Sequence, residues 1–192
     1  MPLTYEPADA KTRQLVTNTM ARFHPCLAHV EARVGALMIW DYDKEGCARA
    51  EALKLKGYPC AAVVKINSLR DRVQGLPDAT ITIDAEHWAR TDAETRAAII
   101  DHELEHLQVK GDGGDVLYWD DVARAVVGGF PVSDAHGRPK LVMKLHDWQL
   151  GGFDSIVKRH GAYALEVVAA RMHLDPESSQ YRWDFAKEVS KP

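Results

Sequence analysis

One stretch governs the interpretation of this chain: Ala98-Ile-Ile-Asp-His-Glu-Leu-Glu-His-Leu107. It contains the pattern H-E-x-x-H, with histidines at 102 and 106 and a glutamate at 103. Residues four apart lie on one face of a helix, so the imidazoles of His102 and His106 can bind one metal ion together. The carboxylate of Glu103 could then reach a water on that metal. This is the arrangement of a zinc hydrolase, with two ligands and a general base.

The surrounding residues predict that this motif lies on an amphipathic helix. The run Thr91-Asp-Ala-Glu94 has the form of a capping box, so a helix should start near Thr91 or Asp92. Glycines at 111, 113 and 114 predict that it ends within a few residues of Leu107. Apolar residues recur at helical spacing and give the helix a core face: Ala97, Ile100, Leu104 and Leu107.

An alternative interpretation is a solvated acidic helix that carries two histidines by chance. Histidine is common in this chain, with 9 among 192 residues, so the motif alone does not exclude this alternative. Asp101 and Glu105, on the expected polar side of the helix, also fit it. The predicted cap and core face favour metal binding, because they place the two histidines beside a core.

A catalytic zinc usually has three protein ligands and an open position for water, so a third ligand is needed. His146 is preferred because it follows an apolar run, Leu141–Leu145, and precedes Asp147, where a helix should begin. Asp147 could instead orient a ligand, cap the next helix or accept the N–H of another ligand. A glutamate ligand about twenty residues after the motif is absent. The candidates after the motif are His136, in an expected turn, His146, Asp147, His160, Glu166 and His173.

Several stretches carry a resemblance to a known family: Gly57–Ile66, Asp71–Gly75, Ile81–Asp84 with Trp88, the H-E-x-x-H motif, Gly137–Pro139, His146–Asp147, Phe153 and Arg159–Gly161. With these residues the chain resembles the putative phage metallopeptidase family, roughly from Tyr5 to Gly161. The resemblance implies a zincin-like metallopeptidase encoded by phages or prophages, with Zn²⁺ as cofactor and a protein or peptide as substrate. A later His-Asp pair recurs in that family, which supports His146 over His136.

Composition narrows the class of protein further. The chain of 192 residues is expected to form one domain over residues 1–175, followed by a polar tail over 176–192. No apolar run reaches 18 residues and no signal peptide is visible, so neither a membrane span nor secretion is expected. Cys26, Cys47 and Cys60 lack paired spacing, which predicts free thiols in the cytoplasm. The net charge of -4 disfavours nucleic-acid binding, and no pattern indicates an oligomeric state.

The remaining patterns predict an α+β fold, with a small mixed sheet, helices and a zincin-like core that has the motif on its active-site helix. Two segments stay open: Cys47–Leu55 as a helix or a variable loop, and Asp120–Val127 as a short helix or an irregular insertion. The strand before the motif, Ala79–Ile83, is expected to be a sheet edge for an extended substrate. Strands are expected at Val34–Trp40, Ala61–Ile66, Ala79–Ile83 and Lys140–Leu145, and helices at Lys11–Phe23, Asp154–Arg159 and Tyr163–Met172, with a helical turn at Glu86–Trp88.

These residues suggest a mechanism and a rival to it. His102, His106 and His146 would hold Zn²⁺, and Glu103 would take a proton from the attacking water and deliver it to the leaving amine. The rival is a non-catalytic zinc-binding regulatory or interaction protein of a mobile element, in which Asp147 or His160 closes the site as a fourth ligand. The developing oxyanion needs a second electrophile, and the candidates are Tyr118, Tyr163, Arg159 and His160.

Overall fold

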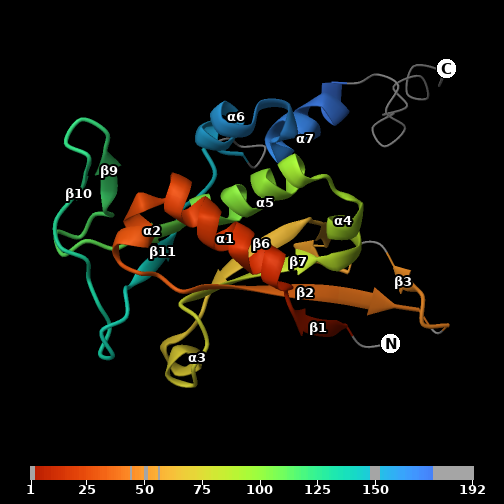
Figure 1. Ribbon diagram of the computed structural model, residues 1–192, viewed down its shortest axis with the longest axis horizontal. Coiled ribbons are helices and arrows are strands. Elements are labelled where there is room, and N and C mark those ends of the chain that lie inside the picture. Colours follow the sequence, from red (N-terminus) through yellow and green to blue (C-terminus); the bar gives the residue numbers. More distant parts are fainter. Residues whose placement is uncertain (1–2, 44, 50–51, 56, 148–151, 175–192) are drawn as a thin grey trace, which may run out of the picture.

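The main sheet of the protein has the strand order β1-β2-β7-β6, with the short β3 added along β2. A computed structural model describes residues 3–43, 45–49, 52–55, 57–147 and 152–174 (Figure 1). Strands β2 and β7 are parallel, whereas β1 pairs antiparallel with β2 and β6 with β7. The strands are β1 (Thr4–Pro7), β2 (Val34–Tyr42), β3 (Ala48–Arg49), β6 (Ala62–Ile66) and β7 (Ala79–Asp84).

Two helices, α1 (Ala10–Phe23) and α5 (Ala93–Glu105), pack on one another over the sheet (Figure 1). Strand β7 alternates apolar and polar residues, and its isoleucines at 81 and 83 are fully buried in the main core. The buried face of α5 supplies Ile99, Ile100 and Leu104 to the same core. The sheet and the apolar stripe of α5 therefore fix the position of the H-E-x-x-H segment.

Short elements surround this core. The helices α2 (Pro25–His29), α3 (Leu69–Val73) and α4 (Ala85–Arg90) connect the strands, and α6 (Asp154–His160), η1 (Gly161–Tyr163) and α7 (Leu165–Leu174) follow near the C-terminus. Three two-stranded sheets complete the description: β4 (Lys54–Leu55) with β5 (Tyr58–Pro59), β8 (Leu107–Val109) with β11 (Leu141–Met143), and β9 (Tyr118–Asp120) with β10 (Ala125–Val127).

The α+β class is confirmed, and so are most predicted elements. The N-cap of helix α5 is Asp92, one of the two predicted starts, but the predicted capping box is wrong: the side chain of Asp92 accepts the N–H of Thr95, whereas Thr91 ends α4. Helix α5 ends within a few residues of Leu107, as predicted, but it stops at Glu105, before the glycines, because Leu107–Val109 pairs as a strand with β11. In the two segments that the sequence left open, the described residues include short strands: β3 and β4 in the first, and the end of β9 with β10 in the second.

The predicted sheet edge at Ala79–Ile83 is wrong. Strand β7 lies inside the sheet between β2 and β6, so it has no free edge. Within the described residues, β6 is the outermost strand on this side. The alternating pattern of β7 could not reveal this, because the parallel β2 pairs with it from a distant part of the chain.

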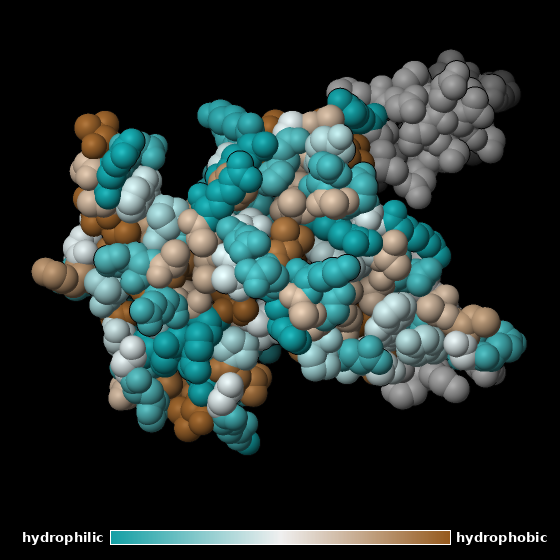
Figure 2. All heavy atoms as spheres, viewed as in Figure 1, coloured by the Kyte–Doolittle hydropathy of each residue, from teal (hydrophilic) through white to brown (hydrophobic). Residues whose placement is uncertain are grey.

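The surface is mostly polar, with apolar side chains gathered at the β9–β10 hairpin and around α3 (Figure 2). Val122, at the tip of this hairpin, is 98% exposed. Among the described residues, no helix is long and apolar enough to cross a membrane. The expected polar tail, 176–192, lies outside the described residues.

Replacing Ile81 with alanine tests the central position of β7. We expect Ile81→Ala to lower the free energy of unfolding by about 2–5 kcal/mol, because a cavity opens where side chains from the sheet and α5 meet. The measurement is urea denaturation followed by circular dichroism. The control Val122→Ala should change the free energy by less than about 0.5 kcal/mol, because that side chain is exposed. Equal effects of the two variants would contradict this packing.

Candidate metal centre

The two motif histidines lie where α5 gives way to β8. His102 is in the last turn of α5 and is buried, whereas His106 caps the helix in a helical conformation and is half-buried. The helical backbone at His106 preserves the four-residue spacing although the helix ends there. Their rings meet edge to face, with centroids 5.2 Å apart.

His146 comes to the same place because β11 pairs with β8. This pairing continues past the strands, where the backbone N–H of Lys144 donates to the carbonyl of His106 at 2.7 Å. His146 follows two residues later, and its Nε2 lies 3.2 Å from the Nε2 of His102. One ligand atom from each of His102, His106 and His146 lies within 4.8 Å of the other two. A tetrahedral zinc with nitrogen ligands needs N···N separations of about 3.3 Å, so the donor set fits such an ion.

Each motif histidine has its ring fixed through Nδ1. The Nδ1 of His102 lies 2.8 Å from Oε1 of the buried Glu166, which is on α7. The Nδ1 of His106 lies 2.9 Å from the carbonyl oxygen of Lys144. Because an acceptor faces each Nδ1, these nitrogens carry the protons and the Nε2 lone pairs remain available for a metal.

Phe153 forms the inner wall of this cluster. It is fully buried, and its ring centroid lies 5.2 Å from that of His102 and 4.9 Å from those of His106 and His146. Its backbone N–H also donates to Glu166 at 3.1 Å. The apolar ring excludes water from one side of the histidines, while the same carboxylate ties Phe153 to His102.

Burial shapes the charge state of the three imidazoles. Desolvation and the neighbouring histidines lower the pKa of His106 to about 4 and also lower the pKa of His146. Burial acts in the same direction on His102, but the hydrogen bond to Glu166 and the nearby carboxylates outweigh it and raise the pKa. His106 and His146 are therefore neutral near pH 7, which is the form that binds metal.

Glu103 is buried beside the histidines and lines the same cavity, of about 380 Å³. Burial raises the pKa of this carboxyl to about 7, although His102 and the backbone N–H of Val64 on β6 favour the charged form. Strand β6 forms another wall of the cavity through residues 61–63, and α7 contributes Leu165, Glu166, Val168 and Ala169. The cavity thus joins the three clustered imidazoles, a proton acceptor and the outer strand of the sheet.

The comparisons with known proteins can be set beside this geometry. The family model described as "Putative phage metallopeptidase" matches residues 3–174. The chain belongs to this family. The match spans every strand and helix named above, together with the three histidines and Glu166. No curated protein and no solved structure was found to match the chain.

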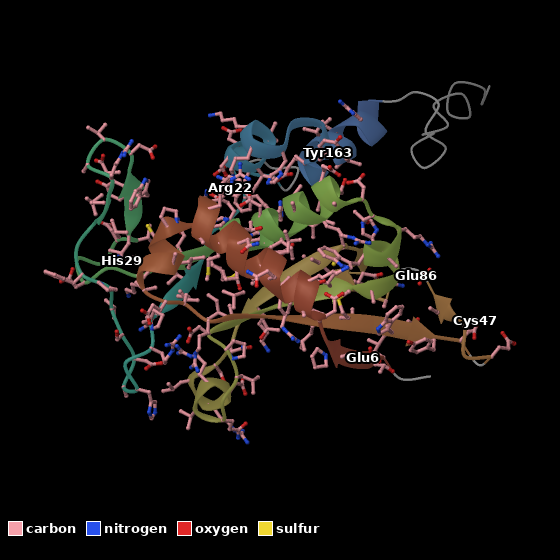
Figure 3. The ribbon with its side chains drawn as sticks, in the orientation of Figure 1. Glu6, Arg22, His29, Cys47, Glu86 and Tyr163 are labelled. Carbon is pink, nitrogen blue, oxygen red and sulfur yellow. The ribbon has the colours of Figure 1, made fainter. Side chains whose placement is uncertain are left out.

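The other predicted site residues of this family member lie elsewhere. Tyr118 is exposed on β9, and Tyr163, labelled in Figure 3, is exposed on η1 beside α6 and α7. Neither they nor His160 line the histidine cavity, so the structure does not place them where they could stabilise an oxyanion. His136 is in a turn, where its backbone N–H donates to the carboxylate of Asp134. Asp147 accepts the N–H of Asp154 at the start of α6, so it supports the next helix rather than a ligand.

The alternative interpretation, in which Asp101 and Glu105 lie on a solvated face, is contradicted by the burial of Asp101. Asp101 has no exposed surface, and its carboxylate faces Nε2 of His24 at 2.6 Å and Nε2 of His160 at 2.8 Å. Arg159 donates to both oxygens of Asp101, at 2.6 and 3.1 Å, and to Glu105. Helices α1 and α6 pack against α5, and the partners come from the residue that ends α1, His24, and from the end of α6. The placement of His160 and Arg159 is therefore explained by the Asp101 carboxylate.

The roles of Glu166 and Phe153 were not predicted from the sequence. Glu166 is a candidate ligand in the sequence, and its distance from the motif disfavours that role. One signal was available: a metal-binding histidine usually donates its second N–H to a carboxylate or carbonyl. That rule predicts a buried acid near His102 but does not say which acid the fold supplies.

Asp101→Asn should lower the free energy of unfolding at pH 7 by about 3–5 kcal/mol, because His24, His160 and Arg159 lose a buried charged partner. Burial alone raises the pKa of Asp101, but the hydrogen bonds from His24 and Arg159 outweigh it, so the pKa in the folded protein is lowered. Because the pKa is lower in the folded protein, the charged carboxylate stabilises the fold above the unfolded pKa of about 3.9. This stabilisation is lost as the pH falls through the folded pKa.

The loss caused by Asp101→Asn should therefore be full at pH 6–7 and shrink below about pH 4. Urea denaturation at a series of pH values measures it. The control Asp121→Asn, at an exposed position, should show neither the loss nor its pH dependence. A loss that stays constant down to pH 3 would contradict the assigned charge.

Proposed function

We propose that this protein is a zinc-dependent peptidase with a zincin-like core, in which His102, His106 and His146 hold the ion. The observation that carries the proposal is the convergence of the three imidazoles with the Nδ1 atoms of two already engaged. Three imidazole nitrogen donors with room for a fourth ligand are typical of catalytic zinc sites. Membership of a metallopeptidase family supports the same chemistry.

A zinc ion held there would act as a Lewis acid and lower the pKa of a water molecule to about 7. Glu103 has the position and the proton affinity for a general base, because it lines the cavity and its pKa is about 7. It would accept a proton from the attacking water and deliver it to the amine that leaves. His102 stays oriented throughout by Glu166, and Phe153 keeps one side of the site dry.

The substrate would lie extended along the free edge of β6. The N–H of Asp84 donates to the carbonyl of Ala61, so alternate residues of β6 from Ala61 onward are bonded to β7. The backbone groups of Ala62 and the carbonyl of Val64 then face away from β7, on the side of the histidine cavity, whereas the N–H of Val64 is already engaged by Glu103. A peptide added there gains main-chain hydrogen bonds whatever its sequence.

Metal content tests the proposed ligands. The wild-type protein should bind about one zinc ion per chain, as read by inductively coupled plasma mass spectrometry after zinc loading and desalting. His146→Ala should lose most of this zinc because only two imidazoles remain, whereas His136→Ala should keep it because that histidine is in a turn outside the cavity. Equal retention by the two variants would rule out His146 as a ligand.

Glu103→Gln should retain the zinc and lose hydrolysis by about 10²–10⁴-fold, because the amide cannot accept the proton. The assay uses zinc-loaded protein and a pooled peptide library, with new termini read by mass spectrometry. The control Glu94→Gln, exposed in the first turn of the same helix, should cleave as the wild type does. If zinc-loaded wild type and Glu103→Gln give the same products, or none, the catalytic proposal fails.

A further inference from the structure

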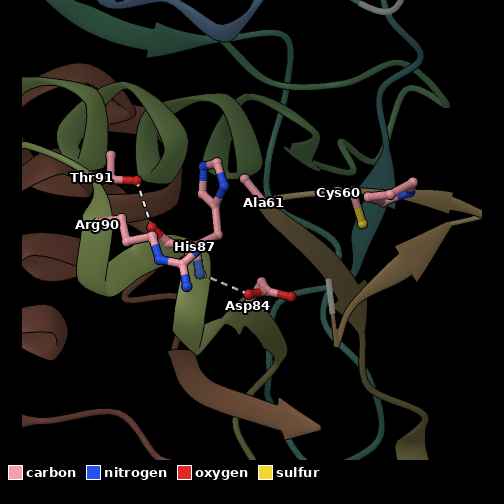
Figure 4. Close-up of a pocket in the computed structure, with 7 residues that line it drawn as sticks. Cys60, Ala61, Asp84, His87, Arg90 and Thr91 are labelled. Atoms are coloured by element: carbon pink, nitrogen blue, oxygen red, sulfur yellow. Dashed lines mark hydrogen bonds between the residues drawn. The ribbon is translucent and has the colours of Figure 1, made fainter. Parts of the chain in front are cut away.

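A second cavity, of about 420 Å³, adjoins the one that holds the histidines. Its lining comes from the end of β5 and the residues just before β6, from the end of β7, and from α4 and the residue that follows it (Figure 4). The two cavities share Pro59, Cys60, Ala61 and His87. A chain that lies along β6 would therefore pass from the histidines directly to the mouth of the second cavity. The proposed function above does not use this space.

We infer that the second cavity is a specificity pocket for an acidic side chain, Asp or Glu, of the peptide substrate. The inference rests on the proposed function for the direction in which the peptide runs. The acidic chemistry of the bound side chain is inferred from the residues that line the pocket, which favour a carboxylate.

The acceptor groups in the pocket are already engaged. Asp84 is fully buried, with Oδ1 accepting the N–H of His87 at 2.8 Å and Oδ2 accepting the N–H of Leu53 at 3.0 Å. The hydroxyl of Thr91 donates to the carbonyl of His87 at 2.7 Å. Asp84 therefore caps α4 and closes the base of the pocket. Because both of its oxygens accept backbone N–H groups, it is not a free partner for a cationic ligand.

The groups with spare hydrogen-bonding capacity are on α4. The ring of His87 has no hydrogen-bond partner within the described residues. Arg90 contacts Glu86 through one terminal nitrogen, which leaves the other N–H groups of its fork available. Figure 4 shows both side chains across the cavity from Cys60. A carboxylate is the ligand that a guanidinium fork recognises best, through two parallel hydrogen bonds.

The opposite wall suits the stem of such a side chain. Pro59 and Ala61 are small and apolar. Burial, with the charges of Glu103 and Asp84, raises the pKa of Cys60 to about 11, so its thiol adds no negative charge to that of Asp84, and a bound carboxylate is expected near Arg90 rather than at this base. Glu86 competes for Arg90, but this ion pair is on the surface, with the Arg90 side chain 66% exposed. Exposed pairs of this kind contribute little, so a substrate carboxylate can take the place of Glu86.

The test measures binding separately from cleavage. The zinc-loaded Glu103→Gln variant is titrated into fluorescein-labelled octapeptides in which one Glu is moved through a neutral background, and each is compared with its Gln twin by anisotropy. At one register the Glu peptide should bind about tenfold more tightly, as expected for a charge-assisted hydrogen bond. Adding Arg90→Gln should abolish the difference, whereas adding Arg90→Glu should reverse it in favour of a Lys peptide.

Glu86→Gln is the matched control, because it keeps Arg90 but removes its competitor. It should preserve or increase the preference for Glu. Equal affinity of Glu and Gln peptides at every register, a preference that survives Arg90→Gln, or no peptide binding would overturn the pocket. Cleavage by the zinc-loaded wild type without an acidic preference would remove the pocket and leave the peptidase standing. Acid-selective binding without cleavage would support the pocket and contradict the peptidase proposal.

Discussion

The carboxylate of Asp101 is a negative charge with no access to solvent, and the arrangement of the helices depends on satisfying it. A buried carboxylate is tolerated only with close donors. Here three side chains supply them: His24, at the junction of α1 and α2, and Arg159 and His160 at the end of α6. The charge therefore holds elements from both ends of the chain against α5, one residue before His102.

The two sides of α5 make different contacts, and Lys144 connects them. Asp101 and Glu105 face the helices that pack against α5, whereas His102 and Glu103 face the cavity. The link runs through Lys144, whose Nζ contacts Glu105 at 2.8 Å and whose carbonyl accepts from His106 at 2.9 Å. The position of His106 is thus connected to the same charge network that fixes the back of the helix.

The sequence predicted the parts of this structure that local rules control. The spacing of His102 and His106, the alternation in β7 and the apolar stripe of α5 need only nearby residues, and the family was identified from such motifs. The burial of Asp101 could not be predicted, because its partners lie 58 to 77 residues away in sequence. His146 was chosen from its place after an apolar run, and its role as a ligand stays a prediction.

Glu166 has a consequence for how the site is assembled. The carboxylate that orients His102 is 64 residues beyond it, on the last helix that the structure describes, and the same carboxylate anchors Phe153. A chain that ends before α7 contains the whole H-E-x-x-H motif but not the acceptor that sets its first ring. During synthesis the motif emerges long before its geometry can be completed. Tight metal binding would then require α7 to be docked, so that metal affinity would report whether this helix is in place.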